Sequence, residues 1–284
     1  MASLAKAELN LLRAKIAAIE KRPVLAEGAA ELAQRVASAG WNSPVRPELK
    51  EIMAVPRGVL HEVFADEQRQ SGPALGFVLG LAQGLISGER QAILYLQLAG
   101  DAQEIGLPYG IGFGRFGLDP EKLVIGRIET IAELLWAMEE AIACSAIAGV
   151  IADISGHPKA LDFTVSRRLS LRAAAAGTSA FIIRYGRQRD ASAAKLRWHV
   201  SSVLSAQQRD DALAPGPPRF LVEIEKRRLG SKMQRSETTK LILDWTDNGF
   251  VSVEPGKQPV SPRRQSAVSR PQSAPLGDRL SQAS

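Results

Sequence analysis

The sequence predicts an α/β fold with a mostly parallel sheet that helices cover on both faces. Apolar segments of strand length alternate with helical segments through the centre of the 284-residue chain. These apolar segments are almost uninterrupted, as expected of strands that are buried on both faces of a parallel sheet. Near the carboxyl end, three strand-like segments follow one another without helices between them, which predicts an antiparallel extension at one sheet edge.

Hydrophobic periodicity gives each expected element in turn. Strands are expected at 58–64, 92–96, 122–126, 147–154 and 179–184. Helices are expected at 73–87, 130–144 and 161–176, and the antiparallel strands at 195–200, 219–226 and 240–245. The helix at 130–144 has an apolar stripe with Glu133, Glu139 and Glu140 outside it. Cys144 falls on the apolar side of this helix, so we expect it in the core.

Four regions are expected along the chain. Residues 1–22 form an amphipathic helical arm that Pro23 ends, and its apolar stripe consists of Leu9, Leu12, Ile16 and Ile19. Residues 23–57 form a connector and residues 58–254 the α/β core. Residues 255–284 are rich in proline, serine and arginine, and we expect this tail to be disordered. The stripe of the arm either packs on its own domain or docks on a partner.

The formal net charge of +6 is concentrated in the tail. Between residues 255 and 284, five basic side chains stand against one acidic side chain, which leaves +2 for residues 1–254. A strongly basic protein often binds nucleic acid, but the expected core is nearly neutral. No apolar run reaches the roughly 18 residues of a membrane span. A single cysteine excludes a disulfide framework, and we expect a cytoplasmic protein without a secretory signal.

One loop of the core has the position of a P-loop but lacks its chemistry. A P-loop, Gly-x-x-x-x-Gly-Lys-[Ser/Thr], follows a strand and binds phosphates through its backbone amides and its lysine. Residues 65–73 contain no lysine and a single glycine, and they add two carboxylates, Asp66 and Glu67. Pro73 also removes a backbone N–H near the start of the next helix, where a phosphate needs donors. The residues predict a degenerate nucleotide site.

Several core segments occur together in an order that is typical of one protein family. They are His61–Phe64, Tyr109–Gly110 with Gly117–Leu123, Leu135–Glu140, Leu161–Leu169 and Arg197–Val200, with the missing P-loop lysine between the first two. In these segments the sequence resembles the ImuA family, RecA-like proteins of bacterial SOS mutagenesis cassettes without a working nucleotide site. The resemblance extends from the N-terminal helix to about Phe250.

The resemblance implies a RecA-like fold with a degenerate P-loop. Within it, Glu62 matches the acidic residue on the strand before the P-loop, and Ser71 and Gly72 take the positions of the P-loop lysine and threonine. Asp153 takes the acidic position at the end of the Walker B strand. The catalytic glutamate of RecA falls near residues 97–99, where there is no carboxylate. Asp153 is either a leftover metal ligand or, as we prefer, an acid that pairs with local donors or faces water.

The resemblance also implies a non-catalytic accessory protein in SOS-induced translesion DNA synthesis. Such a protein, without cofactor or metal, positions an ImuB-type Y-family-like protein and an error-prone polymerase at damaged DNA, and RecA is a further partner. It is expected in the cytoplasm, associated with the nucleoid. Two alternatives remain open. One is an active ATPase in which Arg69 replaces the lysine and Asp153 holds magnesium, and the other is a sequence-independent DNA-binding module.

Basic side chains cluster on the link between two of the expected antiparallel strands. They are Lys226, Arg227, Arg228, Lys232 and Arg235. A basic link of this kind can contact phosphates, and it is otherwise a solvated hairpin tip. No aromatic residue is interleaved with these charges, so the stacking platforms of single-strand binders are absent.

Three other patterns do not indicate a site. Residues 112–117 match Gly-x-Gly-x-x-Gly but lack a strand before them and a helix that starts within them, so we expect a loop. Residues 192–195 match Ser-x-x-Lys without the companion motifs of acyl-enzymes. The histidines His61, His157 and His199 are scattered, and we expect each of them to be structural.

Overall fold

A computed structural model describes residues 52–53, 56–206, 214–228 and 239–253. The strands are β1 (Leu60–Ala65), β2 (Ala92–Leu98), β3 (Leu123–Ile128), β4 (Ile147–Ile154), β5 (Ser179–Tyr185), β6 (Leu196–Ser202), β7 (Arg219–Arg227), β8 (Thr239–Thr246) and β9 (Gly249–Val253). The α-helices are α4 (Ser71–Ala82), α5 (Ala99–Ile105), α6 (Gly110–Gly114), α7 (Ile131–Ala143) and α8 (Phe163–Ala176). Short 3-10 helices are η1 (Gln68–Gln70), η2 (Gln83–Leu85) and η3 (Pro120–Lys122).

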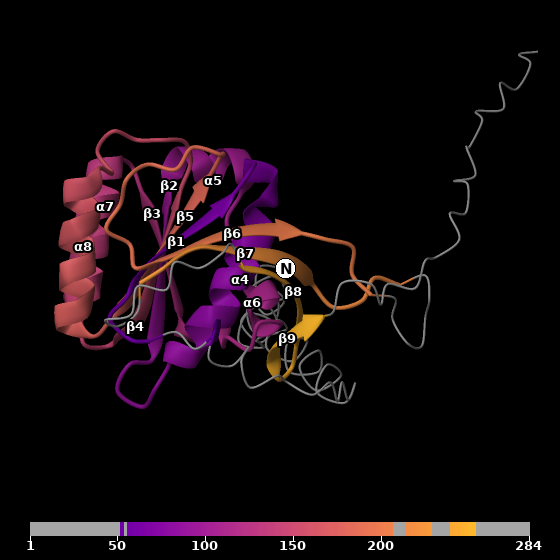
Figure 1. The fold of residues 1–284 in the computed structure, drawn as a ribbon. Helices are drawn as coiled ribbons and strands as arrows, with labels where there is room; N and C mark the ends of the chain where they lie inside the picture. Colours follow the sequence, from indigo (N-terminus) through magenta and orange to yellow (C-terminus); the bar gives the residue numbers. More distant parts are fainter. Residues whose placement is uncertain (1–51, 54–55, 207–213, 229–238, 254–284) are drawn as a thin grey trace, which may run out of the picture.

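The described strands form one nine-stranded sheet in the order β3-β2-β4-β5-β1-β6-β7-β8-β9 (Figure 1). Every pairing from β3 to β6 is parallel, and the pairings from β6 to β9 are antiparallel. This confirms the predicted α/β class and its antiparallel edge. The first of the three strands expected in the antiparallel extension, β6, is antiparallel to β7 and parallel to β1, so it joins the extension to the parallel core. The extension gains β9, a short strand that the sequence analysis missed.

Helices lie on both faces of the sheet (Figure 1). Helices α7 and α8 pack together over β4, β1 and β5, and a core that contains Leu134, Met138 and Leu169 lies between these helices and the strands. Helix α4 covers the other face, against β1, β5 and β6. The two layers agree with apolar strands that are buried on both sides.

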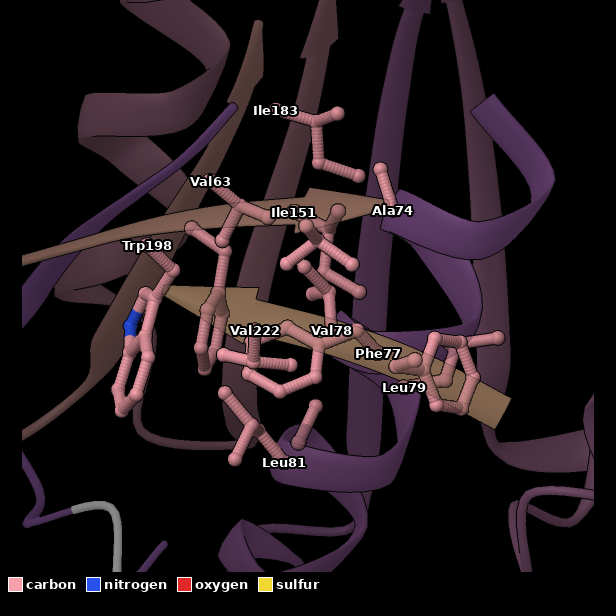
Figure 2. Packing of buried hydrophobic residues seen from close by; sticks show 14 of the residues in the cluster. Val63, Ala74, Phe77, Val78, Leu79, Leu81, Ile151, Ile183, Trp198 and Val222 are labelled. Carbon is pink, nitrogen blue, oxygen red and sulfur yellow. The ribbon is translucent and has the colours of Figure 1, made fainter. Parts of the chain in front are cut away.

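Helix α4 is apolar on nearly all sides because it is covered on nearly all sides. Phe77 packs against Trp198 of β6, with ring centroids 5.5 Å apart, and against Phe250 of β9 at 5.4 Å. Figure 2 shows Phe77 and its neighbours in α4 among side chains of the sheet. On the outer side, Gly80 lies so close to Phe250 and Trp245 that a Cβ there would come within 2.7 Å of both rings. The antiparallel strands therefore fold back over α4.

Local signals set the ends of α7 and α8. Thr130 and Glu133 form a reciprocal capping box at the start of α7. Asp162 accepts a hydrogen bond from the backbone N–H of Val165 at the start of α8, and Gly177 ends that helix in the left-handed region, with φ of 66°.

Two predictions about α7 were wrong. Cys144 is exposed, because the helix ends at Ala143 and the backbone of Cys144 is extended. Glu139 was expected in solvent but is buried, because its carboxylate pairs with Arg168 and Arg172 of α8.

The predicted loop at 112–117 is partly a helix, since α6 reaches Gly114. No strand leads directly into α6, as expected, because α5 separates it from β2.

Candidate functional site

The candidate site lies at the carboxyl ends of β2 and β4, where α4 begins. Ligands of open α/β sheets bind in this position, outside the carboxyl ends of the strands. Ser71 and Gly72 in the first turn of α4, Gln97 near the end of β2 and Asp153 near the end of β4 line one cavity of about 240 Å³. The structure thus brings the three residues of the predicted degenerate nucleotide site, Ser71, Gly72 and Asp153, to the same cavity.

The loop before α4 directs its charges away from phosphate binding. The Asp66 carboxylate lies 3.0 Å from Nε2 of His199. Arg69 is exposed and binds the neighbouring carboxylate of Glu67, with Nη2 3.1 Å from Oε1. In the ATPase alternative Arg69 would replace the P-loop lysine. Its charge is already paired with Glu67 within the loop. Pro73 lies in the first turn of α4, where it supplies no backbone N–H.

Asp153 is held by two tyrosines. The hydroxyl of Tyr95 donates to Oδ2 at 2.7 Å, and the hydroxyl of Tyr185 donates to Oδ1 at 2.8 Å. Burial raises the pKa of Asp153 to about 6, although the two phenol hydrogen bonds favour the carboxylate. Burial also raises the pKa of both tyrosines, so they remain protonated donors. Asp153 therefore pairs with local donors, which is the preferred of the two sequence-based interpretations.

Gln97 stands beside Asp153, since the two are register partners on β2 and β4. This is the region where RecA-like enzymes would place their catalytic carboxylate, and the side chain here is an amide. Its Nε2 donates a long hydrogen bond of 3.5 Å to the carbonyl of Gly106. Its Oε1 is buried and has no partner among the described residues. Gln97 is thus a buried, uncharged hydrogen-bond acceptor at the cavity, and its amide cannot exchange a proton as a catalytic carboxylate does.

The remaining wall is apolar and comes from residues 105–116. Leu107 and Tyr109 of this segment are exposed, and the ring of Phe113 is buried. Leu75 and Leu79 of α4 complete the apolar lining. A magnesium-bound triphosphate needs cationic and N–H donors around its oxygens. The polar side chains that line this cavity are those of Ser71, Tyr95, Gln97, Tyr109 and Asp153, and none of them is a cation. The residues present do not fit that cofactor.

Sequence reasoning missed Tyr95, Tyr185 and the wall at 105–116. The signal for Tyr95 was available, because residues 95 and 97 lie on the same face of a strand and point to the same side of the sheet. Tyr185 is recognisable only once β5 is known to lie beside β4. Among the described residues, no three His, Cys, Asp or Glu side chains gather as metal ligands would.

The basic cluster is only partly described. Lys226 donates to the backbone carbonyl of Ser192 at 2.9 Å, and burial lowers its pKa. Arg227 ends β7 and Arg228 follows it with an exposed side chain. Two further members of the predicted contact, Lys232 and Arg235, lie outside the described residues. The predicted docking stripe, Leu9, Leu12, Ile16 and Ile19, also lies outside them.

The histidines have the contacts of structural residues. His61 is fully buried, stacks on Phe181 with ring centroids 4.5 Å apart, and accepts a hydrogen bond from Nε1 of Trp198 at Nδ1. Burial lowers its pKa to about 3. His157 lies between Arg184 and Asp190, away from the cavity lining.

The sheet order decides the fold class. The strand before the degenerate loop, β1, lies between β5 and β6, and the Asp-bearing strand β4 lies between β2 and β5. This strand order agrees with the RecA-like fold that the resemblance implies. No known family profile and no curated protein matches the sequence. Among solved structures, the chain is similar to a crystal structure of the RadB recombinase at 16% identity and a TM-score of 0.48, over 73% of this chain and 97% of that one.

In the part of the chain that the structure describes, no helix is long and apolar enough to cross a membrane.

Proposed function

We propose that this protein is a non-catalytic RecA-like accessory protein in SOS-induced translesion DNA synthesis. In this role it positions an ImuB-type Y-family-like protein and a mutagenic polymerase at damaged DNA. The observation that carries the proposal is the Tyr95–Asp153–Tyr185 arrangement beside Gln97. Phosphoryl transfer depends on positioning and on stabilisation of charge, and these groups provide neither for a triphosphate.

The segments that resemble the ImuA family support the assignment to translesion synthesis. One of them helps to build the cavity, since Tyr109 lines it. A protein that keeps the RecA-like sheet without its ATP-dependent switch retains surfaces for association. ImuB-type proteins and RecA are therefore the partners that we propose.

The ATPase alternative depends on Arg69 and Asp153. It requires that Arg69 leave Glu67 and that Asp153 exchange two phenol donors for a metal ion. The second step breaks two buried hydrogen bonds to a charged group, which are among the stronger ones in proteins, whereas the exposed Arg69–Glu67 pair contributes little. We therefore favour the accessory role.

Two readouts test the proposal. In a strain that carries this gene, Arg69→Ala is expected to leave damage-induced mutation frequency at the wild-type level, whereas deletion of the gene abolishes it. Purified protein is expected to bind the ImuB-type protein and RecA equally well with and without ATP. Loss of induced mutagenesis in folded Arg69→Ala protein, or binding that requires ATP, would contradict the accessory role. Binding to neither partner would also contradict it.

A further inference from the structure

The cavity at the end of β2 and β4 has the size of a small aromatic binding site. Its volume of about 240 Å³ exceeds the roughly 150 Å³ of an apolar cavity that binds benzene. It falls just below the roughly 300 Å³ at which pockets for drug-sized ligands begin. One bicyclic ring fits this range and a nucleotide does not.

Gln97, which lines the cavity, carries an unused hydrogen-bond acceptor. The amide of Gln97 is oriented by its Nε2, which donates to the carbonyl of Gly106, so the opposite atom, Oε1, is an acceptor. The side chain is 1% exposed and Oε1 has no partner among the described residues. A buried polar atom without a partner costs free energy, so a bound group that donates a hydrogen bond to it gains affinity.

The neighbouring groups narrow the chemistry of the ligand. Asp153, another polar residue of the lining, is also an acceptor, and its two oxygens already receive phenol hydrogen bonds. The acceptor oxygens of Gln97 and Asp153 disfavour an anionic ligand and favour one that donates a hydrogen bond. The walls are leucine and aromatic side chains, including Leu75, Leu79 and Phe113, which suit a flat apolar body.

We propose that this cavity binds an uncharged aromatic group of about the size of an indole, which donates an N–H or O–H hydrogen bond to Oε1 of Gln97. This site goes beyond the accessory role and does not depend on it. A free small molecule and an aromatic side chain of a partner protein share this chemistry. Leu107 and Tyr109 also line the cavity and are exposed, so they add apolar surface to that of the α4 residues.

The test compares two ring systems of the same shape. Full-length protein is titrated with indole and with benzothiophene, in which sulfur replaces the N–H, and binding is measured by calorimetry or saturation-transfer NMR. Indole is expected to bind at least about tenfold more tightly, because benzothiophene leaves Oε1 without a donor. This comparison needs no variant. Absence of indole binding, or equal affinity for both compounds, would overturn the proposal.

Two variants place the binding in this cavity. Gln97→Leu is expected to remove the preference for indole over benzothiophene. Gly72→Phe is expected to block both compounds, since Gly72 lines the cavity and a Cβ there meets no atom within 4 Å. Gly84→Ala, which also meets no atom within 4 Å but lies outside the cavity lining, is the control. Indole binding that survives Gly72→Phe in folded protein would show that the ligand binds elsewhere and would overturn the assignment.

A third ligand separates the two sources of the aromatic group. N-acetyltryptophanamide presents an indole on a peptide backbone. If it binds at least as tightly as indole, the cavity admits a side chain of a partner protein. If it binds at least tenfold more weakly while indole binds, the cavity is selective for a free molecule. The binding measurements use no DNA, RecA or polymerase, so their failure is distinguishable from failure of the accessory role.

Discussion

Tyr95 on β2 and Asp153 on β4 are joined by a 2.7 Å hydrogen bond from the phenol to the carboxylate. The two strands are adjacent and parallel, and the bond lies near their carboxyl ends. A RecA-like enzyme would hold its metal ion at this end of the strands. Tyr185 completes the arrangement from β5. A buried carboxylate in a RecA-like core is in this way satisfied by the protein itself.

The two phenols are expected to contribute to stability. Tyr95→Phe and Tyr185→Phe should each lower the free energy of unfolding by about 2 kcal/mol, because each removes a hydrogen bond to a buried charged group. Urea denaturation at pH 7.5 measures the change. Tyr109→Phe is the matched control, since Tyr109 is 69% exposed, and its effect should stay within about 0.5 kcal/mol. An equal effect of all three substitutions would contradict the assignment.

Asp153 is expected to make stability depend on pH in an unusual direction. Its folded pKa of about 6 lies above its ordinary value of 3.8, so the folded state binds the proton more tightly. The stability that this group adds is greatest below pH 3.8 and is lost as the pH rises through 6. Relative to Asp153→Asn, wild-type protein should therefore lose about 1 kcal/mol between pH 5 and pH 7.

The comparison with Asp153→Asn is needed because His61 acts in the opposite direction. Burial lowers its pKa to about 3, so the stability it adds is present above pH 6.5 and is lost as the pH falls. This effect is common to both proteins and cancels in the difference. Denaturation curves at five pH values would show the trend, and a difference that does not change with pH would refute it.

The buried Glu139 is expected to depend on its two arginines. Arg168→Ala together with Arg172→Ala should cost about 2 kcal/mol, because the variant leaves a carboxylate of 9% exposure without a cation. Arg167→Ala on the same helix is the control, since Arg167 is exposed and its loss should be close to neutral. Thermal denaturation measures both variants. A cost for Arg167→Ala as large as that of the double variant would mean that helix propensity or net charge is responsible.

Gly80 is expected to be intolerant of a methyl group. The Cβ of Gly80→Ala would lie 2.6 Å from Phe250 and 2.7 Å from Trp245, so the rings must shift at a cost of about 2 kcal/mol. Gly84→Ala meets no atom within 4 Å and should be neutral or slightly stabilising. Urea denaturation separates the two. If Gly80→Ala were as stable as Gly84→Ala, β8 and β9 would not pack on α4 as described.

Local sequence patterns predicted the parallel core, because each of its strands and helices has a hydrophobic periodicity that can be read within the element itself. The uninterrupted apolar segment of β4 and the stripe and cap of α7 can be identified within a dozen residues. The errors concern contacts over longer distances. Glu139 is buried because of Arg168, 29 residues away in the sequence. Cys144 was misassigned because the apolar period continues one residue beyond the helix.

The candidate site, like the fold, could be predicted from the sequence only in part. The absence of the P-loop lysine and of a carboxylate near residue 97 is visible in the sequence, and so is the acid at 153. The donors to Asp153 come from β2 and β5, on either side of β4, so they follow from strand order rather than from spacing. The cavity wall at 105–116 has no periodic signal, because it consists of short helices and the segments between them.

We expect that the degenerate nucleotide site does not bind nucleotide. Isothermal titration of the purified full-length protein with magnesium and ATP, up to millimolar concentration, tests it most directly. We expect no saturable heat and no shift in the melting temperature. Saturable binding of ATP that is weakened by Asp153→Asn or by Arg69→Ala would contradict this expectation, because the nucleotide and its magnesium would then compete with Tyr95 and Tyr185 for Asp153.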